Sequence, residues 1–474
     1  MRKSVKKMLA LMLVLALFIT SLTACGKKVT ETGNVDETPT TAATLETEEV
    51  EATPTIAEEP AMDLGGMEIV IGDWWSPAEA AEPTTTQEEA TLEYRQMIQE
   101  KYNFTMKQVA VADWGTMQET FTTSTMAGDP AAEIFLLGQG WVAQPLANGL
   151  LYDLSTLKGF DFTESKWNQS IKDTMTFGDA TYGMASGKPE PKLGVYWNKR
   201  LFEEAGLDPD LPYDLQASGE WTWDKFEELC GKLTLDSNND GTIDSYAMAN
   251  FSAEILGGAI YSNDARYIGR DENGKFYNAT TEPNFLEAAQ WVVSLIQKGY
   301  EMPAPVDANW DWFMAAFHDA KVAMTYGEQY KVGSWADMAD DWGFVLCPKS
   351  PKSDNYQVYF SDNIAVIPSS FDAETAEKIA FAYSLWTNPT PGFEDDVDAW
   401  KDTYYTKFRD ERAVDETLTM MYDSATINTE YSAFVYGVDT GNFLWDTYAL
   451  TKTPAEKIEE VTGIWQSLID DANK

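Results

Sequence analysis

Aromatic and short polar side chains follow two predicted strands of the chain. Asp73-Trp74-Trp75-Ser76 comes directly after the apolar run 67–72, and Gln139 and Trp141 follow the run 132–137. Flat rings beside short polar groups suit a ligand with apolar faces and a rim of hydroxyls, which is the surface of a sugar. Ligands of open α/β sheets lie beyond the carboxyl ends of the strands, so we expect these residues to contact a ligand.

Further candidates flank later predicted strands. Tyr326 and Tyr330 follow the run 321–325, Trp310 precedes the helix before it, and Asp362 precedes the run 364–367. Each aromatic residue has an alternative role in the core, because aromatic residues dominate protein interiors as well as sites. We favour the site for Trp74, Trp75, Trp141 and Tyr330, which lie beyond strand ends. The predicted ligand-binding set is Trp74, Trp75, Ser76, Gln139, Trp141, Trp310, Tyr326, Tyr330 and Asp362.

The loop that begins at Asp236, counted as position one, has the spacing of a calcium site. Oxygen ligands at positions one, three, five, seven and nine, with Gly241 at position six, are typical of an EF-hand loop. Position twelve is Ala247, so the usual bidentate glutamate is missing. The alternative is an Asn/Asp/Gly turn without metal. We predict a structural Ca²⁺ and no catalytic cofactor, with the metal ligands Asp236, Asn238, Asp240, Thr242 and Asp244.

Other chemistry finds little support in the sequence. His318 is the one histidine of the chain, and we expect it on a helix surface. Glycine-rich phosphate loops and zinc-type Cys/His clusters are absent from the sequence. Carboxylates are too numerous for one pair to stand out. We therefore predict a protein that is not an enzyme, and we keep a surface glycoside hydrolase, which would use two carboxylates, as an alternative.

The N-terminal sequence predicts an export signal. Basic residues precede an apolar run at 8–19 that is too short for a permanent membrane span. Leu22-Thr23-Ala24-Cys25 follows and resembles the lipobox of bacterial lipoproteins. This resemblance implies a signal peptide at 1–24 and acylation of the Cys25 thiol. The alternative is an ordinary secretory signal with a coincidental cysteine.

Composition indicates a tether and excludes two classes of partner. Residues 25–66 are rich in Thr, Glu and Pro, and such a segment buries too little apolar surface to fold. The chain carries 77 acidic and 34 basic residues, a net charge of −43. This surface repels nucleic acid and anionic lipid headgroups, so the lipid alone would hold the protein to the membrane. Cys230 and Cys347 allow at most one disulfide.

Strands alternate with helices in the folded part. Apolar runs at 67–72, 106–111 and 132–137 enclose helical patterns, and the second helix stops at Gly128-Asp129-Pro130. This alternation predicts an α/β fold with a mostly parallel sheet covered on both faces.

Five segments, in order, resemble the signatures of one family: 126–135, 148–154, 182–206, 221–226 and 317–324. Gly194-Val-Tyr-Trp-Asn-Lys-Arg-Leu-Phe-Glu-Glu-Ala-Gly206 is the most specific of them. The chain is identified as a member of the extracellular solute-binding proteins (family 1), which are similar to maltose-binding protein and serve bacterial ABC importers. Ala132-Glu133 replaces the family's aspartate, a small departure.

The resemblance implies a periplasmic-binding-protein-like fold with two α/β lobes, a hinge and a ligand cleft. The first lobe would comprise 67–186 and 326–368, and the second 187–325 and 369–474. Tyr330 falls where maltose-binding protein has a sugar-stacking tryptophan. The implied function is capture of a carbohydrate, an oligosaccharide in our prediction, for delivery to an ABC permease. We expect a monomer, lipid-anchored on the extracellular face of the cell membrane; a glycan-binding lipoprotein without transport is a further alternative.

Overall fold

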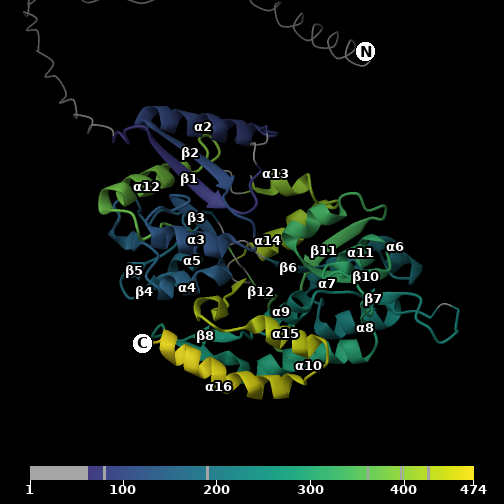
Figure 1. The fold of residues 1–474 in the computed structure, drawn as a ribbon. Helices are drawn as coiled ribbons and strands as arrows, with labels where there is room; N and C mark the ends of the chain where they lie inside the picture. Colours follow the sequence, from purple (N-terminus) through teal and green to yellow (C-terminus); the bar gives the residue numbers. More distant parts are fainter. Residues whose placement is uncertain are drawn as a thin grey trace, which may run out of the picture. The chain divides into compact units, whose positions relative to one another are not determined.

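The computed structural model describes residues 62–77, 82–187, 192–236, 238–359, 362–394, 398, 400–423 and 427–474 (Figure 1). The predicted signal peptide, Cys25 and most of the predicted tether lie outside these residues. Within the described part, no helix has the length and apolar character needed to cross a bilayer.

The first sheet has the strand order β13-β3-β1-β2. Strand β1 (Met67–Asp73) pairs in parallel with β2 (Phe104–Ala110) and β3 (Ile134–Gly138), while β13 (Asn363–Val366) runs antiparallel to β3. Helices α2 (Thr86–Tyr102), α3 (Met117–Ala127) and α12 (Ala373–Trp386) accompany this sheet. We call the sheet and these helices the first lobe.

Local sequence explains where its helices begin and end. Thr85 and Glu88 form a reciprocal capping box that satisfies free N–H groups at the start of α2. Helix α3 ends at Gly128, whose φ of 73° is the left-handed conformation that glycine adopts without strain. The predicted stop signal therefore acts where the sequence places it.

The second sheet has the order β11-β6-β10-β7. Strand β6 (Leu193–Asn198) is buried along its whole length and runs antiparallel to β10 (Val322–Glu328) and β11 (Trp342–Leu346), and β7 (Tyr246–Met248) is parallel to β10. Helices α8 (Trp223–Leu233), α9 (Ser252–Ser262), α10 (Pro283–Gln297) and α11 (Trp312–His318) belong to this second lobe. The predicted α/β fold with two lobes is confirmed.

The C-terminal part returns to the second lobe. Helix α15 (Thr440–Tyr448) packs on α9 and α10, and α16 (Pro454–Ala472) packs on α10 and α15. Strand β12 (Val358–Tyr359) pairs with β14 (Ile427–Asn428). The remaining elements are α4 (Ala143–Ala147), α5 (Gln169–Thr174), β4 (Thr176–Phe177), β5 (Ala180–Thr181), α6 (Lys199–Glu204), α7 (Leu211–Ser218), β8 (Ile268–Arg270), β9 (Phe276–Asn278), α13 (Trp400–Tyr405), a π-helical segment at Ala413–Leu418, and α14 (Thr419–Met421).

The predicted lobe boundaries stay predictions. Strand β11 falls within 326–368, the part that we expected in the first lobe, yet it pairs with β6 of the second sheet. The element order passes from the first lobe to β6, back through β12 to β13, and after α12 again to the second lobe, so the chain crosses between the lobes three times.

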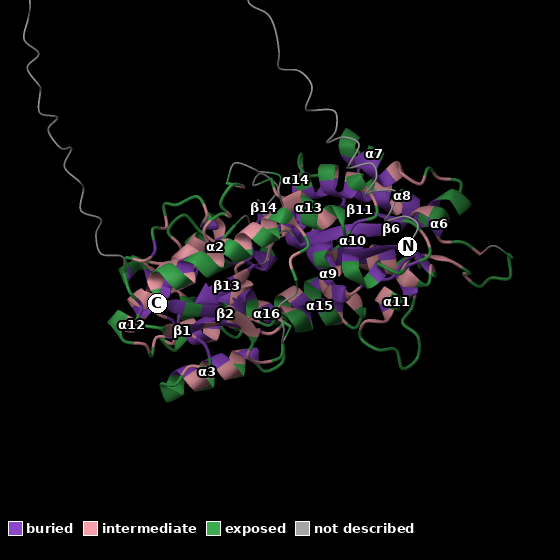
Figure 2. Ribbon diagram, turned by 90° about the horizontal axis from the view of Figure 1, so that it is seen from above, coloured by how far each residue is buried: buried purple, intermediate pink, exposed green. Residues whose placement is uncertain are grey.

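The second sheet and the central strands of the first are mostly buried, whereas the edge strand β2 and one side of α2 and α3 carry exposed residues (Figure 2). The core of the second lobe is largely aromatic: Tyr196 packs against Trp335 and Phe344 at centroid distances of 4.3 and 4.4 Å. Cys230 and Cys347 are both buried there as free thiols. This core fixes the second sheet, from which part of the candidate site extends.

Candidate functional site

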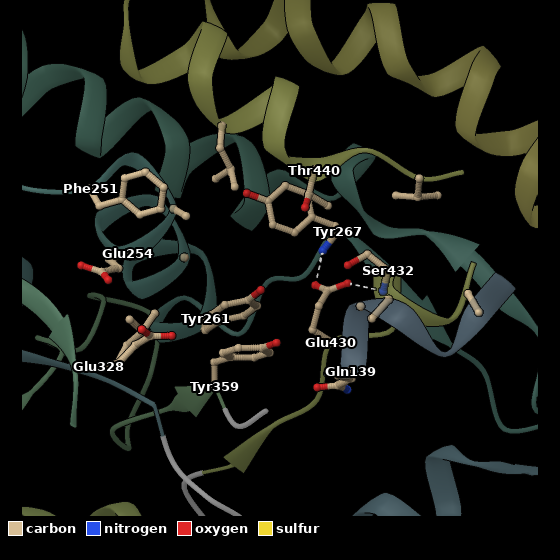
Figure 3. A pocket seen from close by; sticks show the side chains of 18 of the residues that line it. Gln139, Phe251, Glu254, Tyr261, Tyr267, Glu328, Tyr359, Glu430, Ser432 and Thr440 are labelled. Carbon is tan, nitrogen blue, oxygen red and sulfur yellow. Dashed lines mark hydrogen bonds between the residues drawn. The ribbon is translucent and has the colours of Figure 1, made fainter. Parts of the chain in front are cut away.

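A cavity of about 890 Å³ is lined by residues of both lobes (Figure 3). The first lobe contributes Trp114, which follows β2, and four residues that follow β3: Gln139, Gly140, Ala143 and Gln144. The second lobe contributes α9 and the segment 430–440, which we call the C-terminal loop. That loop contacts the first lobe, since its turn Ser432–Phe434 packs on Gln139–Trp141. The cavity thus lies where the lobes approach each other.

Aromatic rings form much of the cavity wall. Tyr261 of α9 and Tyr359 of β12 lie parallel, with centroids 4.6 Å apart and planes 14° apart (Figure 3). Other rings of the wall keep more than half of their surface exposed, and a ligand can cover them. These exposed rings are Trp114 (62%), Trp310 (71%), Tyr330 (54%) and Tyr436 (57%).

Four tryptophans cluster at the first-lobe end of the cavity. Trp74 packs edge-on against Trp75, Trp114 and Trp141, with centroids 4.5, 5.3 and 4.8 Å away. Trp114 also packs on Trp141 at 4.4 Å. Only Trp114 of the four lines the cavity directly, and the other three support it from behind.

The turn that carries Trp74 and Trp75 is held by Asp73. This residue is fully buried at the end of β1, and its carboxylate accepts hydrogen bonds from the Trp75 and Ser76 N–H groups at 3.1 and 2.9 Å. It also accepts from the Ser76 hydroxyl at 2.5 Å and from Nε2 of Gln108 at 2.7 Å. Because both carboxylate oxygens of Asp73 accept hydrogen bonds from the protein, Asp73 positions the tryptophan cluster and does not contact a ligand.

Glu430 fixes the C-terminal loop. Its carboxylate accepts the backbone N–H groups of Tyr267, Ile268 and Ser432 at 2.7, 3.1 and 2.7 Å. Burial raises the pKa of Glu430, while these hydrogen bonds act to lower it. The Glu430 side chain thus ties the loop to β8, together with the backbone hydrogen bond from the Tyr431 N–H to the Ile268 carbonyl at 3.3 Å.

The cavity also holds an ion pair and unpaired acceptors. Lys331 donates to Oε1 of Glu254, and both side chains are nearly buried. Oε2 of Glu254 and Oε1 of Gln139 are buried without a hydrogen-bond partner among the described residues. Buried acceptors without partners are costly, so a donor brought by a ligand would stabilise this arrangement after a small rotation of these side chains.

The predicted ligand-binding residues divide into three groups. Gln139, Trp310 and Tyr330 line the cavity, while Trp74, Trp75, Ser76 and Trp141 form its support. Tyr326 lies elsewhere: it is 1% exposed, packs on Phe226 and lies against Gly258 in the core. Asp362 lines a different cavity and accepts a 2.6 Å hydrogen bond from Asn168.

Sequence reasoning missed several lining residues, including Tyr261, Tyr267, Tyr359 and Glu430. Tyr359 stands beside the predicted Asp362 and could have been included by proximity. Glu430 lies in a segment without periodic pattern, and no sequence signal marks it.

The structure does not support the calcium prediction. In the described part of the loop, the Asp236 carboxylate accepts the N–H groups of Asp240 and Gly241, and Asn238 also accepts the Asp240 N–H. Asp240 in turn accepts the N–H of Thr242. The loop thus closes through its own hydrogen bonds. Among the described residues, no group of three or more His, Cys, Asp or Glu side chains is placed to hold a metal ion.

One family model matches more than half of the chain. The sequence model of the bacterial extracellular solute-binding proteins matches residues 80–378. No curated protein sequence matches the chain significantly.

Three solved structures illustrate the shared fold. An ABC substrate-binding protein from Listeria monocytogenes in complex with cycloalternan is 16% identical, with a TM-score of 0.59, and the match covers 86% of this chain and 98% of that one. The cyclic α-maltosyl-1,6-maltose-binding protein from Arthrobacter globiformis is 14% identical, with a TM-score of 0.62 and coverages of 86% and 100%. UgpB from Mycobacterium tuberculosis, in complex with glycerophosphocholine, is 16% identical, with a TM-score of 0.59 and coverages of 85% and 98%.

Proposed function

The chain belongs to the family of bacterial extracellular solute-binding proteins, and from that premise we propose that it captures an oligosaccharide between its lobes and delivers it to an ABC permease. The observation that carries the proposal is the wall of the 890 Å³ cavity, which contains both exposed aromatic rings and side chains with polar acceptors. Rings stack on the C–H faces of sugars, and acceptors take their hydroxyl protons. One structural neighbour named above is in complex with cycloalternan and another is a cyclic α-maltosyl-1,6-maltose-binding protein, which supports this ligand class.

The proposed mechanism of ligand capture follows from the cavity wall, to which both lobes contribute residues. A ligand that touches Trp114 of the first lobe and α9 of the second gains all its contacts only when the lobes are closed. It therefore shifts the hinge equilibrium toward the closed state, which the permease would recognise. This cycle involves no covalent chemistry, so we propose that the protein is not an enzyme.

The proposed location rests on the N-terminal sequence. Acylation of Cys25 would anchor the protein at the extracellular face of the membrane, and residues 25–66 would act as a tether. Labelling with a radioactive fatty acid in the native host tests this, with Cys25→Ser as the variant that loses the label. We further propose a monomer, which size-exclusion chromatography with light scattering checks.

The test of the proposed function is a titration. Purified protein is titrated with linear and cyclic gluco-oligosaccharides and with manno-oligosaccharides, followed by tryptophan fluorescence and calorimetry. Saturable binding of an oligosaccharide, tighter than that of its monosaccharide, is the expected result. Failure of every sugar to bind would overturn the carbohydrate part, and glycerophosphocholine is included because one structural neighbour holds it.

Two alternatives are separated by simple measurements. A surface glycoside hydrolase would release reducing sugar from the bound oligosaccharide, whereas a binding protein leaves it intact. A glycan-binding lipoprotein without transport would leave sugar uptake unchanged when its gene is deleted, whereas loss of the proposed transport function abolishes uptake.

A further inference from the structure

A second cavity, of about 630 Å³, lies against the first lobe. One face of α2 lines it through Gln87, Thr91 and Arg95, which are spaced four residues apart and so share one side of the helix. The C-terminal end of α12 and the segment that follows it form the facing wall. The 890 Å³ cavity described above is called the sugar cavity, after its proposed ligand. None of the described residues that line it also lines this second cavity.

The guanidinium of Arg95 is the notable group in this wall. Its Cζ lies over the ring of Trp386, 4.0 Å from the ring centroid, in a cation–π contact. Its Nε is buried without a hydrogen-bond partner, and no carboxylate among the described residues pairs with it. In a chain with 77 acidic residues, a largely buried arginine without a counter-ion is an uncompensated charge. Burial accordingly lowers the pKa of Arg95.

The groups around Arg95 are mainly hydroxyls and amides. The hydroxyls of Thr91 and Thr390 are 2.7 Å apart, and Nδ2 of Asn388 donates to the Tyr94 hydroxyl at 2.9 Å. Asp362 is the one acidic side chain among the described lining residues, and its Oδ2 accepts from Asn168 at 2.6 Å. Such a wall offers polar partners to hydroxyl groups and one cation to an anion.

We propose that this cavity binds a small hydroxylated carboxylate, with its carboxylate paired to Arg95 and its hydroxyls on the threonine and asparagine side chains. A guanidinium presents two parallel N–H groups that match a carboxylate, and the contact with Trp386 restricts the Arg95 side chain before a ligand binds. The proposal is independent of the sugar cavity, because the two walls share no residue.

The test uses sodium galacturonate and gluconate as probes, titrated by calorimetry at constant ionic strength. Sodium sulfate serves as the non-carboxylate anion and galactose as the neutral sugar. Arg95→Gln removes the cation. Thr91→Glu places a carboxylate one turn before Arg95, where it pairs with the guanidinium and fills the site without removing the stacked side chain. Lys101→Gln, on the same helix, is the matched control because it removes an exposed charge.

We expect saturable binding of a hydroxylated carboxylate to the unchanged protein and to Lys101→Gln, and at least a tenfold loss in Thr91→Glu. If Arg95→Gln does not fold, the binding measured with Thr91→Glu tests the proposal by itself. Unchanged binding in either site variant, equal binding of sulfate, or no saturable binding of either acid would overturn the proposal. Repeating the titration in Trp114→Ala separates this site from the sugar cavity: a loss there would place the acid in the sugar cavity and also overturn the proposal.

Discussion

The carboxylate of Glu430 accepts the backbone N–H of Tyr267 at 2.7 Å, although the two residues lie 163 positions apart in the chain. Together with its bonds to Ile268 and Ser432, this contact attaches the C-terminal loop to the second lobe. The loop supplies a large share of the cavity wall and touches the first lobe. The buried Glu430 side chain therefore helps to fix the position of that wall, together with the Tyr431–Ile268 backbone hydrogen bond and the burial of Phe434.

Replacing Glu430 should weaken both folding and ligand binding. Glu430→Ala leaves three N–H groups without their acceptor, and we expect the free energy of unfolding to fall by about 2–4 kcal/mol. Sugar affinity should fall as well, because the loop loses its fixed position. Urea unfolding and sugar titration measure the two effects. Glu459→Gln, at an exposed position of α16, is the control that should change neither; equal stability of Glu430→Ala and the unchanged protein would contradict this role.

Trp114 should contribute to affinity but little to stability. Its ring lines the cavity and is 62% exposed, so Trp114→Ala removes a stacking surface without opening the core. We expect oligosaccharide affinity to fall about tenfold, the equivalent of roughly 1.4 kcal/mol. Trp445→Ala is the matched control, since that ring is 60% exposed on α15 and lies outside the cavity wall. Equal losses in both variants would show that Trp114 acts through general packing.

Asp73 and Gln108 allow a double-mutant test of the turn that carries the tryptophan cluster. Gln108→Glu alone sets two carboxylates at a 2.7 Å contact and should destabilise the fold by about 1–3 kcal/mol. Adding Asp73→Asn turns the pair into an amide that donates to a carboxylate, and part of the loss should return. Thermal unfolding of both single variants and the double variant measures the coupling. Strictly additive losses would show that this hydrogen bond does not stabilise the turn.

Glu301 should make stability depend on pH. Burial raises its pKa to about 7, although the Tyr448 hydroxyl donates to it at 2.5 Å and the N–H and Nδ2 groups of Asn250 donate at 2.7 and 2.8 Å. Because the folded-state pKa lies above the unfolded value, the folded protein binds more protons between about pH 4.5 and 7. The stabilisation is complete below this window and is lost as the pH rises through 7.

The effect of Glu301 is at most about 3 kcal/mol across that window. Glu301→Gln cannot titrate, so its stability should vary less between pH 5 and 7.5 than that of the unchanged protein. Denaturant unfolding at a series of pH values checks this. Parallel pH profiles for the two proteins would show that Glu301 does not titrate in this range.

Calcium should leave the stability unchanged. The loop at 236–244 closes through its own side-chain-to-backbone hydrogen bonds, and the bidentate glutamate of a calcium loop is missing. We therefore expect the same melting temperature in excess calcium and in excess chelator. A melting temperature that rises with calcium concentration, and does not rise in Asp236→Ala, would restore the calcium prediction.

The fold could be predicted because its signals are local. The stop at Gly128 and the alternation of apolar runs with helical patterns act within a few residues, and they appear in the structure where the sequence placed them. Of the residues expected at the first sheet's strand ends, Gln139 lines the candidate cavity, while Trp74, Trp75 and Trp141 form a cluster with Trp114 beside it.

The direction of a side chain on a doubly covered strand could not be predicted in the same way. Residues Val322 to Gly327 of β10 are all buried, so polarity does not alternate along the strand and nothing local shows which face Tyr326 occupies. The structure places Tyr326 against Gly258, which leaves room for its ring. Tyr330 is exposed because it follows the end of β10 at Glu328 and so lies outside the buried strand.

The sequence by itself determined the α/β architecture, the family and the part of the site that follows strand ends. Only the tertiary structure decided the opposite wall, where Tyr261, Tyr359 and Glu430 come together from three distant segments. The physical reason is that caps and periodicity depend on neighbours along the chain. A cavity wall depends instead on which distant segments share the same buried space.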